Sequence, residues 1–264
     1  MKQLLHKLYL LMVIGGIDPL KAIRAVRGIP FFFHDLKKLK NQKRLSQIDF
    51  PFGRLFPILG DRFSHGGEAR GHYFHQDLLV ARRIFLNNPK LHVDIGSRVD
   101  GFVAHVASYR KIEIFDIRLV TSNINNVTFT KSDFMDEIDK SLVDYCDSIS
   151  SLHVLEHFGL GRYGEPIKYD GYLYGLDNIY KVLKRGGKFY FSVPIGLQRI
   201  EFNAHRVFSV KYLLELLGKK YNVDFFSYVD DKGDLHEDVV LDKDAVANNF
   251  GCSYGCGIFE MTKL

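Results

Sequence analysis

Side chains suited to acid–base chemistry gather in three short segments of the sequence. The segment LHVLEH places His153, Glu156 and His157 within five residues of one another. The segments GHYFHQD and FNAHR add further histidines and polar groups. Histidine suits proton transfer because its ordinary pKa lies close to neutral pH. The histidines expected to act as a base at a reacting group are His153, His157 and His205.

A second group of residues suits the binding of a nucleoside. In HVDIGSR, Asp94 ends a predicted strand, and Gly96 lies in a tight turn before a helix with free N–H groups. Asp116 follows 20 residues after Gly96 in IFDIR, where a carboxylate can accept both ribose hydroxyls. In KSDF, Asp133 can accept from an adenine amino group. Ser97 and Arg98 replace the further glycines that a pyrophosphate needs, so S-adenosylmethionine fits better than NAD.

These residues need elements that bring them together. Helical spacing over 73–86 is followed by alternating short apolar strands and helices from about residue 91 to the C-terminus. Alternating strands and helices indicate a mostly parallel sheet with helices on both faces. Ligands of such sheets bind at the carboxyl ends of the strands. We therefore expect DIGSR, FDIR, KSDF, SSLHVLEH and SVPIG at one rim.

The ordered segments VDIGS, FDIR, KSDF, SISSLHVLEHF and LKRGGKFYFSVP resemble the successive motifs of class I S-adenosylmethionine-dependent methyltransferases. The resemblance covers about residues 73–262. It implies an α/β, Rossmann-like three-layer αβα fold with a mostly parallel seven-stranded sheet and an antiparallel last strand. It also implies S-adenosyl-L-methionine as cofactor. The expected cofactor-binding residues are Asp94, Gly96, Ser97, Arg98, Asp116, Ile117, Asp133, Phe134, Ser151 and Leu152.

The acceptor of the methyl group is suggested by a narrower resemblance. The phrases YFHQDLLVA, LEHFGLGRYG and FNAHRVFS are similar to a methyltransferase-like group of bacterial surface-polysaccharide gene clusters. This resemblance favours O-methylation of a sugar or glycan-linked metabolite. The Gly- and Tyr-rich segment 159–175 is expected either to cover the acceptor or to act as a rigid connector. The expected substrate-binding residues are Tyr73, His75, Gln76, Arg162, Tyr163, Asn203 and Arg206.

The N-terminal segment differs from the rest in charge. Residues 1–50 carry ten Lys and Arg against three Asp, a net +7 within a chain of net +5. Its apolar run is too short to span a bilayer and lacks a signal-peptide cleavage pattern. We expect a helical basic extension over 1–60 and a methyltransferase domain over 61–264. The extension is a candidate peripheral contact with the inner membrane face, whereas no nucleic-acid-binding signature accompanies it.

The cysteines indicate a reducing, cytoplasmic compartment. Only three are present, and Cys252 and Cys256 have no second Cys/His pair that would complete a zinc motif. A metal site built from His153, His157 and His205 is conceivable, but the spacing matches no motif, so no metal is expected. Two other functions remain open: a nicotinamide-dependent sugar-nucleotide oxidoreductase or epimerase, and a non-catalytic binding protein on the same fold.

Overall fold

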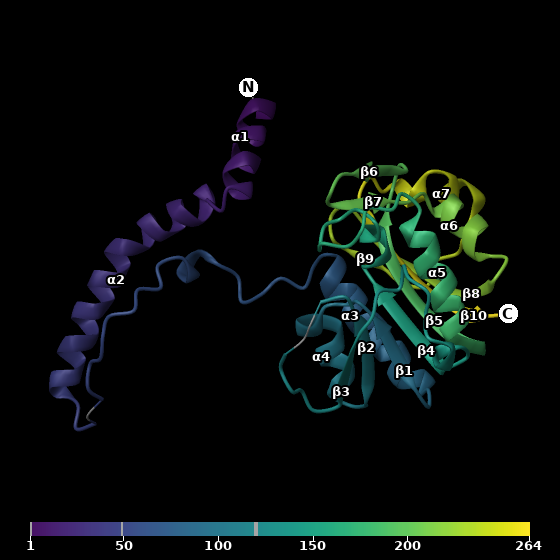
Figure 1. Cartoon of the computed structure of the whole chain (residues 1–264). Coiled ribbons are helices and arrows are strands. Elements are labelled where there is room, and N and C mark those ends of the chain that lie inside the picture. Colours follow the sequence, from purple (N-terminus) through teal and green to yellow (C-terminus); the bar gives the residue numbers. More distant parts are fainter. Residues whose placement is uncertain (1, 49, 119–120) are drawn as a thin grey trace. The chain divides into compact units, whose positions relative to one another are not determined.

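The computed structural model describes residues 2–48, 50–118 and 121–264, and it divides the chain into two compact units (Figure 1). One unit ends at Glu68, and the other comprises Ala69–Leu264. The two units are described separately below.

The N-terminal unit is built around two helices, α1 (Lys2–Ile14) and α2 (Pro19–Leu45). Asp18 caps α2 by accepting from the backbone N–H groups of Leu20 and Lys21 at 3.0 and 3.1 Å. The chain after α2 returns along the helix and passes close to Gly28. A Cβ at Gly28 would lie 1.9 Å from the Leu59 carbonyl oxygen. Glycine is therefore required at this close approach. The helical N-terminal extension predicted from the sequence is present.

The second unit contains an eight-stranded sheet in the order β3-β2-β1-β4-β5-β10-β8-β9 among the described residues. Strands β3, β2, β1, β4 and β5 pair in parallel, whereas β10 is antiparallel to both β5 and β8. The strands of this sheet are β1 (His92–Ile95), β2 (Ile112–Asp116), β3 (Val127–Lys131), β4 (Cys146–Leu152), β5 (Leu183–Ile195), β8 (Tyr221–Val229), β9 (Leu235–His236) and β10 (Gly255–Lys263).

Helices cover both faces of the sheet because side chains alternate across each strand. The α-helices of this unit are α3 (His72–Asn87), α4 (Ala104–Ala107), α5 (Gly171–Val182), α6 (Val210–Leu217) and α7 (Lys243–Ala247). Its other helical turns are η2 (Val99–Val103), η3 (Lys140–Leu142), η4 (Leu155–His157) and η5 (Asn249–Gly251), whereas η1 (Asp61–Phe63) belongs to the N-terminal unit. Phe189 and Phe191 of β5 pack with residues of α5 and α6, whereas Tyr190 between them packs with residues of α3, η2 and α4. The predicted three-layer Rossmann-like αβα fold is thus confirmed.

The structure differs from the predicted elements in three places. The segment YGLDNIYKVLKRGG predicts a helix that ends at Gly186 and Gly187, but α5 ends at Val182, because Leu183 is extended and pairs with Cys146 at the start of β5. A two-residue strand, β9, extends the predicted seven-stranded sheet. A small hairpin of β6 (Arg199–Glu201) and β7 (His205–Val207) follows β5.

None of the helices in the described part of the chain is long and apolar enough to cross a membrane.

Candidate functional site

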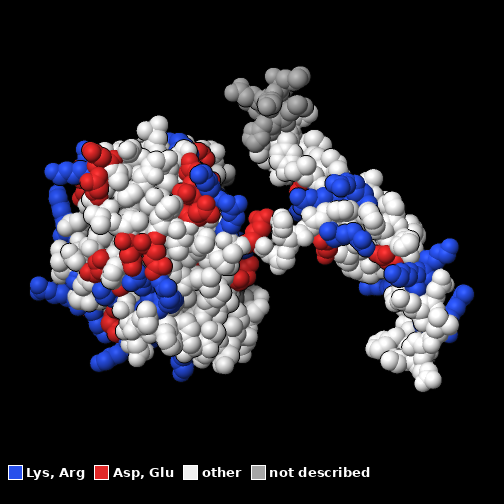
Figure 2. Space-filling view, turned by 180° about the vertical axis from the view of Figure 1, so that it is seen from behind, with Lys and Arg blue, Asp and Glu red and all other residues white. Residues whose placement is uncertain are grey.

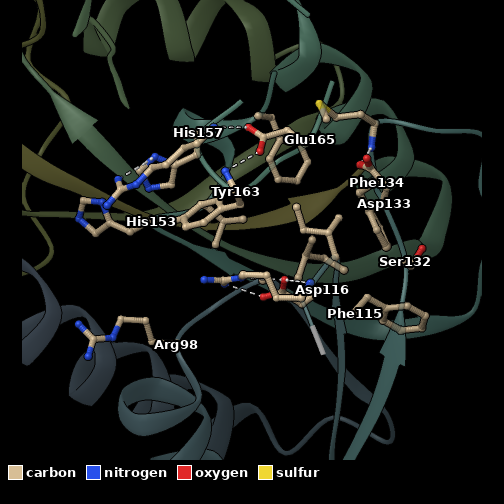
Figure 3. Close-up of a pocket in the computed structure, with 18 of the residues that line it drawn as sticks. Arg98, Phe115, Asp116, Ser132, Asp133, Phe134, His153, His157, Tyr163 and Glu165 are labelled. Atoms are coloured by element: carbon tan, nitrogen blue, oxygen red, sulfur yellow. Dashed lines mark hydrogen bonds and ion pairs between the residues drawn. The ribbon is translucent and has the colours of Figure 1, made fainter. Parts of the chain in front are cut away.

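A pocket opens at the carboxyl ends of β1, β2 and β4, where the sequence predicts a binding site. Figure 3 shows Asp133 and Phe134 at one end, His153 and His157 at the other, and Asp116 between them. The predicted site residues that line this pocket are Tyr73, Gly96, Arg98, Asp116, Ile117, Asp133, Phe134, Leu152, His153, His157, Arg162 and Tyr163.

The turn after β1 is held by Asp94. Its fully buried carboxylate accepts hydrogen bonds from the Ser97 backbone N–H at 2.9 Å and the Ser97 hydroxyl at 2.7 Å. Burial raises the pKa of Asp94 to about 6. Gly96 follows with φ +70°, and a Cβ there would lie 2.7 Å from a methyl carbon of Val154. Only glycine fits this turn, and Asp94 shapes it from below rather than lining the pocket.

Asp116 at the end of β2 already has a partner in the pocket. Arg118 donates from Nε to Oδ1 at 3.1 Å and from Nη2 to Oδ2 at 2.7 Å. The same guanidinium lies 4.5 Å from the centre of the Tyr163 ring. Hydrogen bonding to Asp116 raises the pKa of Arg118. The pair presents a carboxylate and a planar cation to the same part of the cavity.

Asp133 lies beyond the end of β3. It accepts a hydrogen bond from the Met135 backbone N–H at 2.8 Å, and burial raises its pKa. Phe134 beside it is buried and packs edge-on against Phe115 at 5.8 Å between ring centroids. A half-buried carboxylate next to aromatic rings can accept from the amino group of a flat heterocycle.

The two pocket histidines have different environments. Nδ1 of His153 lies 2.7 Å from a carboxylate oxygen of Glu156, which is fully buried. Burial alone would lower the pKa of His153, but the Cys256 sulfur and the Glu156 carboxylate raise it well above its ordinary value. His157 Nδ1 lies 2.7 Å from the Ala204 carbonyl oxygen, and burial lowers the pKa of its ring.

The tautomer of His157 follows from this contact. A carbonyl oxygen can only accept, so Nδ1 of His157 carries the hydrogen. Because burial holds the pKa of His157 below its ordinary value, the ring is neutral at pH 7 and Nε2 keeps its lone pair. Its Nε2 lies 3.7 Å from Glu156, whose charge would stabilise a proton taken up there.

The segment after η4 is folded tightly over one side of the pocket. The Glu165 carboxylate accepts from the backbone N–H groups of Gly161 at 2.8 Å and Tyr163 at 2.8 Å. Arg162 donates from Nη1 to the Ala204 carbonyl at 3.0 Å. At the start of the segment, Gly159 has φ +75°, and a Cβ there would lie 1.9 Å from the Lys168 carbonyl oxygen. These contacts form a compact connector that also contributes pocket-lining side chains.

Several predicted site residues do not line the pocket. Arg206 donates to the carbonyls of Glu156, Phe158 and Tyr169, because the β6–β7 hairpin turns its side chain inward. Gln76 is buried and accepts from the Ser192 hydroxyl at 2.6 Å. The other predicted site residues outside the pocket lining are Asp94, Ser97, Ser151, His75, Asn203 and His205.

The structure also adds residues that the sequence prediction left out. Arg118 lies two residues after Asp116, and its charge in a strand-end segment was a usable signal. Glu165 became a pocket residue only through the fold of its loop, which no periodicity reveals. The additional lining residues are Ile95, Phe115, Arg118, Ser132, Met135, Val154, Phe158 and Glu165.

Comparison with solved structures places the fold among known methyltransferases. The chain is similar to a Burkholderia thailandensis 1,6-didemethyltoxoflavin N1-methyltransferase solved with S-adenosylhomocysteine, with 15% identity, a TM-score of 0.51, and coverage of 74% of this chain and 79% of that one. It is also similar to the N-methyltransferase NodS of Bradyrhizobium japonicum WM9, with 12% identity, a TM-score of 0.50, and coverage of 72% and 96%.

A third similar structure carries a different chemistry. The [4+2]-cyclase SpnF shares 15% identity and a TM-score of 0.52, with coverage of 75% of this chain and 85% of that chain. Identities this low establish a shared fold and not a shared reaction. The sequence has no significant match among curated proteins.

One family model matches the sequence itself. It covers residues 103–249, which is more than half of the 264 residues and includes Asp116, Asp133, His153 and His157. The chain therefore belongs to the family described as Caenorhabditis protein of unknown function, DUF268.

Proposed function

We propose that residues 61–264 form an S-adenosylmethionine-dependent methyltransferase domain. One observation carries the proposal: the glycine turn at Gly96 and the carboxylates of Asp116 and Asp133 line a single pocket at neighbouring strand ends. Position 96 must be glycine because of its positive φ and the nearby Val154 methyl, and a turn without a Cβ would let a ligand come close to the backbone. A ribose carboxylate with an adenine carboxylate, and no pyrophosphate turn, matches the polar groups of this cofactor.

The pocket residues fit the cofactor from end to end. Asp133 would accept from the adenine amino group, Asp116 would accept from the ribose hydroxyls, and Arg98 would hold the carboxylate of the amino-acid end. Arg98 is paired with Asp100 at 2.8 Å, and both side chains are mostly exposed, so the guanidinium is free to turn. When bound, the cofactor supplies an activated methyl group on a sulfonium.

His157 is the best candidate for the base. Methyl transfer to a hydroxyl needs little beyond positioning and removal of one proton. His157 is neutral, presents the Nε2 lone pair, and has Glu156 close by to stabilise the resulting imidazolium. His153 already shares a proton with Glu156 at 2.7 Å, so it is better suited to positioning the carboxylate.

The acceptor that we favour is a hydroxyl of a sugar or glycan-linked metabolite, made in surface-polysaccharide biosynthesis. The histidine end of the pocket combines the Tyr73 and Tyr163 rings with Arg98 and Arg162. Aromatic rings and planar multi-donor cations suit the apolar faces and hydroxyl groups of sugars. The similarity to polysaccharide-cluster methyltransferases supports the same class.

Calorimetry with S-adenosylhomocysteine tests the proposal. The intact protein should bind it, and Asp116→Ala should weaken binding by at least about tenfold through loss of a charged hydrogen-bond acceptor. Asp177→Ala, which removes an exposed carboxylate of α5 outside the pocket lining, is the matched control. Binding of NAD(P) in place of S-adenosylhomocysteine would instead indicate the oxidoreductase or epimerase.

Activity needs a second measurement. Transfer of a labelled methyl group from the cofactor to nucleotide sugars or lipid-linked saccharides should be lost in His157→Ala, while S-adenosylhomocysteine binding remains. A protein that binds the cofactor but labels no acceptor across these classes would favour the non-catalytic alternative.

We also infer a peripheral membrane contact of a cytoplasmic protein through the N-terminal unit. Leu11 and Ile14 of α1 and Val26 of α2 are exposed, and lysines and arginines stand beside uncharged surface along the same unit (Figure 2). Apolar groups flanked by cations suit an anionic lipid surface. The protein should sediment with anionic vesicles and much less with neutral ones. Replacing Lys37, Lys38 and Lys40 by Ala should abolish the difference between the two vesicle types.

A further inference from the structure

Three potential metal ligands from distant parts of the sequence come together beside the pocket. His72 begins α3, His153 follows β4, and Cys256 lies in β10. One ring nitrogen of each histidine and the sulfur of Cys256 all lie within 4.8 Å of one another. The two imidazole rings are stacked, with 5.2 Å between centroids and 4° between planes. Two imidazoles and a thiol are therefore already gathered by the fold.

His153 is held in the orientation that a metal ligand requires. Its Nδ1 lies 2.7 Å from the Glu156 carboxylate, while its Nε2 is buried and has no hydrogen-bond partner within the described ranges. Histidines that bind metals usually donate their second ring N–H to a carboxylate or a carbonyl, which fixes the tautomer and the ring direction. Glu156 supplies this second contact, and Nε2 is the atom left for an ion.

The backbone also fixes His153. Its φ is +55°, a left-handed conformation that side-chain-bearing residues adopt at a cost of order 1 kcal/mol. The backbone N–H of His153 donates to the Ser192 carbonyl at 3.0 Å, so the conformation is held by the adjacent strand β5. The ring is thus placed by two elements and by Glu156, which is more support than a merely space-filling side chain needs.

We propose that His72, His153 and Cys256 bind a zinc ion. Borderline-soft Zn²⁺ prefers imidazole nitrogen and thiolate sulfur, with bonds of about 2.0–2.3 Å. Such bonds set tetrahedral ligand atoms about 3.5 Å apart, so side-chain movements of about an ångström close the site. Three protein ligands leave a fourth position for water or for an oxygen of a substrate, as in catalytic zinc sites.

The place of the site suggests its use. His153 also lines the pocket at the end opposite Asp133, so a bound ion would border the expected acceptor position. There it would polarise an acceptor hydroxyl and lower its pKa. This use rests on the proposed methyltransferase function, whereas binding of the ion does not.

Two measurements on the full-length protein, prepared without a histidine tag, test the site. Elemental analysis should find about one zinc per chain. Titration of chelator-treated protein with Co²⁺ should produce the near-ultraviolet charge-transfer band of a thiolate–cobalt bond. The band should disappear in Cys256→Ala, and His72→Ala should weaken Co²⁺ binding by at least about tenfold. Cys252→Ala, which removes another buried thiol outside the cluster, should keep the band.

Circular dichroism shows which of the variants fold. If Cys256→Ala does not fold, the partly exposed His72 provides the informative variant, and His72→Gln should still weaken Co²⁺ binding. Lack of a thiolate–cobalt band in the folded wild-type protein, or its persistence in folded Cys256→Ala, would overturn the proposal. Calorimetry of the metal-free protein with S-adenosylhomocysteine separates the two ideas, because the cofactor can bind without cobalt and cobalt without the cofactor.

Discussion

Arg118 forms a bidentate ion pair with the carboxylate of Asp116 inside the pocket, with Nε 3.1 Å from Oδ1 and Nη2 2.7 Å from Oδ2. The Arg118 backbone N–H also donates to Oδ1 at 2.8 Å. Both oxygens that we assign to the ribose hydroxyls are therefore already engaged. Cofactor binding and the ion pair compete for the same acceptors.

The first prediction follows from this competition. Arg118→Ala should bind S-adenosylhomocysteine about fivefold more tightly, because one partly exposed ion pair of about 1 kcal/mol no longer has to be broken. Calorimetry measures the change, and the exposed Arg185→Ala is the control for lost positive charge. Weaker binding in Arg118→Ala would mean that the guanidinium contacts the ligand directly.

The second prediction concerns recognition of the base. Asp133 can accept from the amino group of adenine but repels the carbonyl oxygen that hypoxanthine carries at that position. The protein should therefore prefer S-adenosylhomocysteine to its inosine analogue by at least about tenfold. Asp133→Asn presents both a donor and an acceptor and should bind the two with similar affinity. The neighbouring exposed Asp136→Asn should keep the preference, and a preference retained in Asp133→Asn would contradict the assignment.

The fold was predictable from the sequence because its signals are local. Short segments such as HVDI and CDSISSL, which are buried along almost their whole length, alternate with helices, and that alternation implies strands that share one rim. Asp116 and Asp133 were found for this reason, since a residue at a strand end is placed by its strand. The C-terminal end of α5 was missed because it depends on the pairing of Leu183 with the distant Cys146. The small hairpin was missed because its strands are only three residues long.

The residues on the acceptor side of the pocket were less predictable, because contacts between separate segments decide where their side chains lie. Arg206 is polar and follows β5, yet the hairpin directs it to backbone carbonyls. The His205 ring packs at a tilt against Tyr254, with 5.0 Å between ring centroids, and its Nε2 lies 3.1 Å from a Glu201 carboxylate oxygen, outside the pocket lining. Cys256 approaches His153 because β10 inserts beside β5, whereas His72 approaches it from the first residue of α3. No spacing rule in the sequence contains that contact.

The third prediction compares two glycines of the segment over the pocket. Gly159 and Gly164 both have positive φ, but a Cβ at Gly159 meets the Lys168 carbonyl at 1.9 Å, whereas a Cβ at Gly164 meets nothing within 4 Å. Gly164→Ala should lower the free energy of unfolding by about 1 kcal/mol from backbone conformation alone. Gly159→Ala should cost at least about 2 kcal/mol more and should also weaken ligand binding, because the segment must shift.

Urea unfolding and calorimetry on the two glycine variants provide the measurement. Their matched backbone conformation isolates the steric term, so equal losses of stability would show that the Gly159–Lys168 approach does not constrain the segment. A stability loss without any change in ligand affinity would separate the segment from the pocket.

The fourth prediction concerns pH and the buried His92 of β1. Its Nδ1 lies 2.7 Å from the Ser148 hydroxyl and its Nε2 3.2 Å from the Ser150 hydroxyl. Burial lowers the pKa of His92 to about 3. In the unfolded chain the ring takes up a proton below about pH 6.5. Between these values the unfolded state binds more protons, so the free energy of unfolding must fall as the pH falls.

The free energy of unfolding should fall by about 3 kcal/mol between about pH 7 and pH 4.5 through the His92 ring alone. Asp77 and Asp94, whose pKa values burial raises to about 6, act in the opposite direction, since their native states bind the extra proton. The contribution of His92 is therefore read from the difference between the wild type and His92→Asn in urea unfolding across this range. The variant should lose the acid-dependent fall, whereas the exposed His105→Asn should retain it. Parallel pH profiles of the wild type and His92→Asn would show that His92 is protonated in the native state.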